Sequence, residues 1–249
     1  MILSCLPERR KEQLTKLPAP KIVSTSIQEK RNFISAALTT GFDCAMMGSS
    51  VRIARFFVMR LLLHTCCAPC GVYCIDSLRS EGIDPTCFWY NPNIHPYQEY
   101  KARRDTLIDY AASLHLELAV HDEYGLRDFV RAVAEDIARR CVHCYACRLE
   151  ETARYAAGNG FTHFSTTLLV SPYQDHDGIC RAAEQAAARY GVEFLYRDFR
   201  PGFRQGQAKA RELGLYMQKY CGCVFSEEER YARQIQRDRE RFSAYPLSI

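Results

Sequence analysis

Three groups of cysteines are the residues of this sequence best suited to do chemistry. They lie at Cys66-Cys67-Ala68-Pro69-Cys70, at Cys141-Val142-His143-Cys144 and at Cys221-Gly222-Cys223. One pair of cysteines two residues apart is a weak signal, but three groups in one chain indicate a metal site, an iron–sulfur cluster or redox chemistry. A structural zinc ion would need four ligands in two pairs, and this chain offers at least seven candidates.

Iron–sulfur clusters need thiolate ligands that are held by short, constrained segments. We predict that the ligands of such a cluster are Cys66, Cys67, Cys141 and Cys144. A disulfide between Cys221 and Cys223 would close a small, strained and therefore labile ring. We expect these two residues either to act as a redox dithiol beside the cluster or to hold a second metal together with Cys70. His64, just before the first group, is expected to be a hydrogen-bonded structural residue.

The first cysteine group follows a predicted strand and precedes a predicted helix. The apolar run 61–63 is typical of a fully buried strand, and residues 71–78 have the pattern of a helix start. Further strands are predicted at 84–90, 116–120, 161–169 and 192–199, and helices at 97–114, 126–139, 149–157, 177–190 and 205–213. This alternation indicates an α/β fold, a parallel sheet with helices on both faces. A last, charged helix is predicted to be capped by Ser226.

The loops that follow the predicted strands bring distant residues to one place. In open α/β sheets ligands bind beyond the carboxyl ends of the strands. We therefore expect a cysteine-rich active-site crevice at that edge of the sheet. Four polar side chains fall in the same loops and are predicted to line it: Asn91, Asn93, Tyr173 and Gln174.

Composition and patterning suggest one main domain. The chain has 249 residues, of which 47% are hydrophobic and 25% charged, as in a globular protein. A shift in composition near residue 59 divides an N-terminal appendage, 1–58, which need not be ordered, from an α/β domain at 59–249. No run approaches the roughly 20 apolar residues that span a bilayer. We expect a cytoplasmic protein with no membrane partner, whose 13 cysteines are reduced or metal-bound.

The distribution of charge limits how the chain can contact a nucleic acid. The formal net charge is +4, but residues 1–58 hold nine basic and four acidic side chains, so the rest is close to neutral. A nucleic-acid partner must therefore use a local patch. The densest local excess of positive charge consists of Arg197, Arg200, Arg204, Lys209, Arg211 and Lys219, which precede the third cysteine group.

Taken together, these motifs resemble the epoxyqueuosine reductases of the QueH type, from about residue 61 to residue 231. The resemblance rests on His64-Thr65-Cys66-Cys67-Ala68-Pro69-Cys70, Asn91-Pro92-Asn93-Ile94, Glu99-Tyr100, Cys141 to Cys144 with Arg148-Leu149, Ser165-Thr166-Thr167-Leu168-Leu169, Ser171-Pro172-Tyr173-Gln174, Asp198-Phe199-Arg200 and Tyr220-Cys221-Gly222-Cys223. It implies a Rossmann-like sheet of nucleotide-hydrolase-like topology.

The resemblance also implies an activity and its partners. Members of this family remove the epoxide oxygen of epoxyqueuosine at the wobble position of tRNA, using a 4Fe-4S cluster and no cobalamin. The substrate would be a tRNA anticodon loop, and an unidentified electron donor would supply the reductant. An aspartate can replace Cys70 in the family, and both residue types can bind a metal. A mononuclear iron or zinc ion adjacent to the cluster is therefore an open alternative. Asp198 and Arg200 join the four crevice residues as candidates for substrate contact or proton supply.

Two other functions are compatible with parts of the pattern. A nucleotide-dependent tRNA-modifying enzyme of the thiolation type also begins with strand, loop and helix, but its loop is rich in small residues that cradle phosphate. Here the loop is bulky and rich in thiols. An iron–sulfur electron carrier would hold the cluster, but it has little use for a polar crevice around it.

Overall fold

The computed structural model describes residues 59–243 and residue 245 of the chain. Five parallel strands form a sheet in the order β3-β2-β1-β4-β5. The strands are β1 (Leu61–His64), β2 (Thr86–Trp89), β3 (Leu118–Val120), β4 (His163–Thr166) and β5 (Glu193–Phe194). This is the strand order of a Rossmann-like sheet, so the predicted fold class is confirmed.

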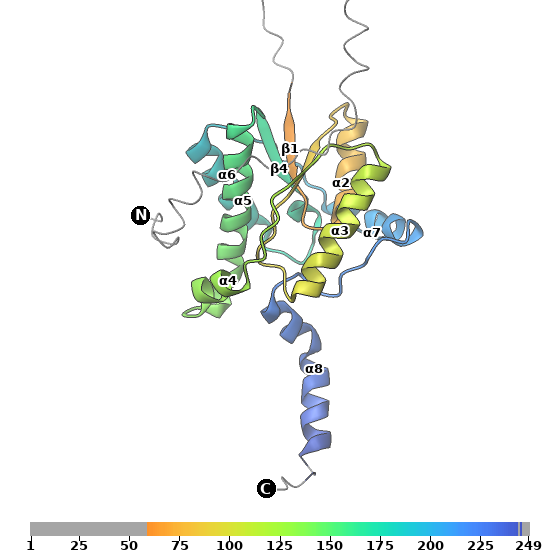
Figure 1. Ribbon diagram of the computed structural model, residues 1–249, viewed down its shortest axis with the longest axis vertical. Helices are drawn as coiled ribbons and strands as arrows, with labels where there is room; N and C mark the ends of the chain where they lie inside the picture. The colour runs from red at the N-terminus through yellow and green to blue at the C-terminus, as the bar shows by residue number, and fades with distance from the viewer. Residues whose placement is uncertain (1–58, 244, 246–249) are drawn as a thin grey trace, which may run out of the picture.

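Helices cover both faces of the sheet (Figure 1). On one side lie α2 (Ala68–Ser80), α3 (Tyr97–Ser113) and α7 (Phe203–Glu212), and on the other α4 (Leu126–Val133), α5 (Arg140–Gly158) and α6 (His176–Tyr190). Strand β1 lies in the middle, and its three leucines expose 2% or less of their surface. A central strand covered on both faces must be apolar throughout, which explains the unbroken run 61–63.

The strand order reverses between β1 and β4. After β1 the chain adds β2 and β3 on one side, then crosses back to place β4 on the other side. Strands β1 and β4 pair in register from Leu61 with His163 to His64 with Thr166. The loops after these two strands therefore leave from the same edge in opposite directions. Such a switch point is where open α/β sheets form their ligand crevices.

Several element boundaries differ from the predicted ones for local reasons. The predicted strand 192–199 is only Glu193–Phe194. At its far end Asp198 accepts a hydrogen bond from the Arg200 backbone and closes a turn. The predicted helix 126–139 ends at Val133 and is followed by the 3-10 turn η2 (Ile137–Arg139), capped by Asp136. Two further 3-10 turns are η3 (Thr167–Val170) and η4 (Arg200–Gly202).

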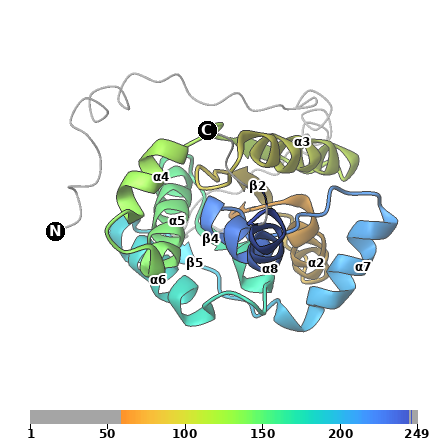
Figure 2. The same cartoon turned by 90° about the horizontal axis from the view of Figure 1, so that it is seen from below.

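The last helix, α8 (Val224–Phe242), has no buried residue. It extends away from the rest of the described chain in Figure 1, and Figure 2 shows it nearly end-on. Its N-cap is Cys223, so the prediction that Ser226 caps it is wrong. The Ser226 hydroxyl instead lies within the first turn, where it donates to the Cys223 carbonyl. No helix among the described residues is long and apolar enough to cross a membrane. The predicted appendage 1–58 lies outside the described residues.

Candidate metal centre and active site

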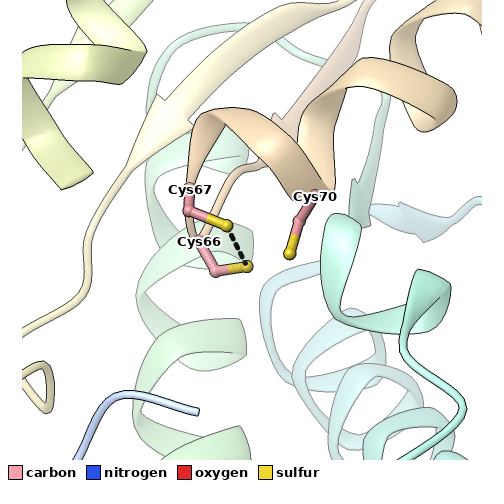
Figure 3. Close-up of side chains that lie close together, drawn as sticks. All are labelled: Cys66, Cys67 and Cys70. Carbon is pink, nitrogen blue, oxygen red and sulfur yellow. Dashed lines mark hydrogen bonds between the residues drawn. The ribbon is translucent and has the colours of Figure 1, made fainter. Parts of the chain in front are cut away.

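The sulfur atoms of Cys66, Cys67 and Cys70 form a compact triad just beyond β1 (Figure 3). All three Sγ atoms lie within 4.8 Å of one another. The triad forms because α2 begins at Ala68 with Pro69 in its first turn, and that turn carries Cys70 back toward the two cysteines before the helix. A metal–thiolate bond is about 2.3 Å long. Sulfur atoms at this spacing can therefore bind a metal ion or part of a cluster.

Cys66 is the thiol of the triad that ionises most readily. Hydrogen bonds from Cys67 and Cys70 lower the pKa of Cys66 well below its ordinary value, and the Thr167 hydroxyl donates to the same sulfur at 3.5 Å. Burial raises the pKa of Cys67. The Gln218 amide donates to Cys67 Sγ at 3.1 Å and to Cys70 Sγ at 3.4 Å. Hydrogen-bond donors thus surround the sulfurs, as thiolate ligands require.

A buried layer of polar side chains supports the cysteine loop from below. His64 Nε2 lies 3.2 Å from Asn91 Oδ1, and its Nδ1 lies 2.9 Å from Thr166 Oγ1. Asn91 Nδ2 donates to the Thr65 carbonyl at 3.1 Å. Burial, aided by the charge of Arg148, lowers the pKa of His64 to about 4. His64 is therefore neutral and structural, as predicted. Asn91 is fully buried and its amide is used within the protein.

Arg148 lies among the three cysteine groups and contacts the second of them directly. It is 2% exposed and its Nη2 donates to Cys144 Sγ at 2.6 Å. Burial acts to lower the pKa of Arg148, but the charges of Cys144, Cys221 and Cys66 outweigh it and raise that pKa. Asn93 Nδ2 adds a second hydrogen bond to Cys144 Sγ, at 3.1 Å. One buried guanidinium thus faces thiols from all three cysteine groups.

A buried ion pair holds the third cysteine group in place. Arg103 Nη1 donates to the Cys221 carbonyl at 2.8 Å, and its Nη2 donates to the Tyr220 carbonyl at 2.9 Å. Arg103 also pairs with Glu99 at 2.6 Å, and the two side chains are 1% and 9% exposed. The second Glu99 oxygen accepts a hydrogen bond from Tyr216. The backbone before Cys221 is therefore clamped to α3.

The glycine between Cys221 and Cys223 is required by its backbone and by its neighbours. Gly222 has φ +154° and accepts a hydrogen bond from the His95 N–H at 2.7 Å. A Cβ atom there would lie 3.2 Å from Ile94 Cγ1. We expect Gly222→Ala to lower the free energy of unfolding by about 1–3 kcal/mol and to slow turnover, because a strained position must shift the adjacent thiols.

Denaturant unfolding and turnover assays check this prediction. Gly158→Ala is the matched control, since a Cβ at that helix end meets nothing within 4 Å. It should change stability by less than about 1 kcal/mol. Equal stability and equal turnover in Gly222→Ala and wild type would show that the segment tolerates a side chain.

The thiols of Cys221 and Cys223 face different neighbours. Cys221 is near Arg148 and Cys66, whereas Cys223 is beside Cys141 and Arg140. Both are free thiols in this structure. Cys141 and Cys144 lie three residues apart in the first turns of α5, so they share one face of that helix. Cys70, predicted beside a second metal, lies in the triad with Cys66 and Cys67.

The other predicted crevice residues lie at different depths. Tyr173 is 85% exposed, and its ring packs edge-on against Phe203 at 5.7 Å. Gln174 Oε1 and Asn93 Oδ1 are buried acceptors without a hydrogen-bond partner among the described residues.

The predicted basic segment is partly neutralised. Arg200 pairs with Asp198 at 2.8 Å, Arg197 with Glu81 at 2.9 Å and Lys209 with Asp76 at 2.6 Å. Hydrogen bonding to Arg200 lowers the pKa of Asp198 to about 2, so Asp198 is ionised. Four members of the segment are exposed, namely Arg200, Arg204, Arg211 and Lys219, and of these Arg200 is the one paired with Asp198. The sequence alone overstated the positive charge of this region.

The sequence alone predicted no role for four residues of the site: Arg148, Arg103, Glu99 and Gln218. Arg148 follows Cys144 by four residues, and Arg103 follows Glu99 by four. On a helix this spacing places both members on one face, so recognising the helix start at Arg140 would have revealed the first pair. No local signal identifies Gln218, which reaches the triad from far along the chain.

Fold and site together define an α/β protein with a buried thiol triad, able to bind a metal ion or part of a cluster, at the switch point of a parallel sheet. Residues 61–229 match the family model described as "Epoxyqueuosine reductase QueH". The chain belongs to this family, as its motifs predicted.

Curated relatives of the chain carry the same name. A protein named epoxyqueuosine reductase QueH from Dehalococcoides mccartyi is 39% identical over 175 residues, which are 70% of this chain and 96% of the relative. One from Thermotoga maritima is 38% identical over 192 residues, covering 73% of this chain and 97% of the relative. One from Haemophilus influenzae is 33% identical over 175 residues, which are 67% of this chain and 71% of the relative. The similarity thus spans nearly the full length of the first two relatives.

Proposed function

We propose that this protein reduces epoxyqueuosine to queuosine at the wobble position of tRNA. The observation that carries the proposal is the buried triad of Cys66, Cys67 and Cys70, which lies within the region that matches the family named for this reaction. The triad stands at the switch point of the sheet, where the fold provides a crevice for a substrate.

The reaction removes the epoxide oxygen as water and leaves a carbon–carbon double bond, so it consumes two electrons and two protons. Thiolates favour iron–sulfur chemistry, and we assign Cys66, Cys67, Cys141 and Cys144 as ligands of a 4Fe-4S cluster. When bound, such a cluster supplies electrons singly from an external donor. The shared helical face of Cys141 and Cys144 supports this assignment.

The remaining thiols have a second role in the proposal. Cys221 and Cys223 act as a redox dithiol, or with Cys70 they hold a mononuclear iron or zinc ion beside the cluster. The position of Cys70 within 4.8 Å of two cluster ligands supports a shared or adjacent metal. The clamp from Arg103 to the Cys221 carbonyl supports a fixed location for the pair.

The polar residues around the thiols are assigned to the substrate. The unpartnered oxygens of Asn93 and Gln174 would accept hydrogen bonds from the modified base. The exposed ring of Tyr173 can stack on a base, as aromatic side chains do with unpaired nucleotides. Asp198 and Arg200 are assigned to substrate contact or proton supply. Asn91 acts through the cysteine loop, whose Thr65 carbonyl it holds.

The structure offers less support for the two alternative functions. A phosphate cradle would occupy the turn between β1 and α2, and the sulfur atoms of the triad occupy that place. An electron carrier would leave the buried oxygens of Asn93 and Gln174 without a purpose.

Anaerobic purification followed by iron and sulfide assays tests the cluster. We expect a coloured protein with about four iron and four sulfide per chain, because a 4Fe-4S cluster contains four of each. Mass spectrometry of tRNA nucleosides from cells with and without the protein should show epoxyqueuosine replacing queuosine when it is absent. A colourless protein that carries only stoichiometric zinc would contradict the cluster assignment.

The variant Cys70→Ala separates the two metal assignments. If Cys70 holds an adjacent ion, the variant keeps its sulfide and loses about one metal ion per chain, since a mononuclear site binds a single ion. Loss of sulfide together with iron would instead make Cys70 a cluster ligand.

A further inference from the structure

Helix α8 begins directly beside the third cysteine group, and it packs against the protein core through Phe225 in its first turn. Its N-cap is Cys223, and none of its residues is buried. An open cavity of about 470 Å³ lies at its start and is lined by Tyr220, Cys221, Ser226, Glu229, Arg230 and Arg233. Core packing at its first turn does not explain why so long a helix extends away from the rest of the described chain (Figure 1).

One face of α8 carries a line of arginines that starts in the cavity. The four residues Arg230, Arg233, Arg237 and Arg241, which we call the arginine stripe, recur at intervals of three or four. At about 100° per residue they fall within an arc of about 80°, and from first to last they span about 16 Å. Arg239 lies on the opposite face. Ser226, which lines the cavity, falls within the same arc, so the stripe is continuous with the surroundings of Cys221.

The charges of the arginine stripe are not neutralised within the described residues. No carboxylate there forms an ion pair with any of its four guanidinium groups, whereas Arg197, Arg200 and Lys209 near α7 are all paired. The acidic residue of the cavity lining, Glu229, pairs with Arg140 at 2.5 Å. Helix α8 as a whole carries five acidic and five basic side chains, and the stripe gathers four of its five arginines on one face without an ion pair among the described residues. Arg241 also lies over the Phe242 ring at 5.3 Å, a contact that leaves its charge in place.

We propose that the arginine stripe binds the phosphate backbone of the RNA whose modified base enters the cavity at Cys221. The proposal rests on the proposed function, which makes a tRNA the substrate. Guanidinium groups bind phosphate oxygens in pairs, and about 16 Å covers several phosphates at the roughly 3.4 Å per nucleotide of a stacked strand. A single-stranded loop allows the base to enter while its backbone lies along the helix.

The salt dependence of tRNA binding tests the stripe. A triple variant replaces three members of the stripe with glutamine: Arg233→Gln, Arg237→Gln and Arg241→Gln. It should bind substrate tRNA more weakly than wild type. The slope of the logarithm of the binding constant against the logarithm of the salt concentration should fall in magnitude by about 2, at roughly 0.7 per lost contact. Arg230 and Arg233 both line the cavity. Arg230 is retained because it is the member of the stripe nearest to Cys221 along the chain. The matched pair is Arg237→Gln, which should weaken binding, and Arg239→Gln on the opposite face, which should not. Iron and sulfide content should equal that of wild type in all of them.

Three results separate failure of the stripe from failure of the function. An unchanged slope in the triple variant, with wild-type turnover, overturns the stripe while the reductase activity stands. The proposal is also overturned if the triple variant binds tRNA as wild type does and loses turnover only when a protein donor replaces dithionite. In that case the stripe is a docking surface for an acidic electron-transfer protein. A wild-type protein that binds tRNA with the expected slope but never converts it contradicts the proposed function and leaves the stripe as an RNA-binding surface.

Discussion

Cys66→Ala is expected to leave the protein without the proposed metal group and to reduce conversion of epoxyqueuosine tRNA to background. Cys66 Sγ is 3.8 Å from Cys67 Sγ and accepts hydrogen bonds from both other thiols of the triad. It is therefore the sulfur whose negative charge is best prepared for a metal. Because the free energy of metal binding depends on a complete set of thiolates, its loss should affect the whole group. Iron and sulfide assays and nucleoside mass spectrometry measure both effects.

Cys74→Ala is the matched control for this variant. Cys74 lies on α2, the helix that begins directly after Cys67, and it is fully buried, but it is not a member of the triad. We expect it to keep its metal and activity and to lose about 1 kcal/mol of stability, as for a small group removed from a core. Full metal content in Cys66→Ala would contradict the assignment, and so would an equal loss of metal in Cys74→Ala.

Arg103→Met is expected to lower the free energy of unfolding by about 3–5 kcal/mol, because it leaves the buried carboxylate of Glu99 without its partner. It also removes the donors to the Tyr220 and Cys221 carbonyls. The segment before Cys221 should then move. Turnover should therefore fall by more than the decrease in the fraction of folded protein would explain. Urea denaturation measures the first effect, and the rate of Cys221 alkylation measures the second.

The same helix supplies a control for Arg103. Lys101 and Asp105 also form an ion pair four residues apart on α3, but their side chains are 48% and 38% exposed. Lys101→Met should change stability by less than about 0.5 kcal/mol, as for other exposed pairs. Adding Glu99→Leu to Arg103→Met should recover part of the loss, because no charge then stays buried. A cost below 1 kcal/mol for Arg103→Met would show that solvent reaches the pair.

The parts of the fold that depend on local pattern could be predicted. The apolar run 61–63 identified β1 because a strand covered on both faces has no polar alternation. The start of α5 was missed because residues 140–148 contain cysteine, valine, histidine and tyrosine, which have modest helix propensity. Packing of that helix against β1, β4 and α6 outweighs the weak local preference.

The sequence by itself determined the chemistry available to this protein, since three cysteine groups with a short spacing permit few uses other than metal or redox sites. It also determined the α/β class, because alternating strands and helices form parallel sheets. Only the tertiary structure decided which side chains meet. Arg103 reaches the Cys221 carbonyl across 118 residues, and Arg148 reaches Asn91 across 57. Contacts of that kind depend on the strand order and on where each helix begins. The local spacing of residues in the sequence predicts neither of these.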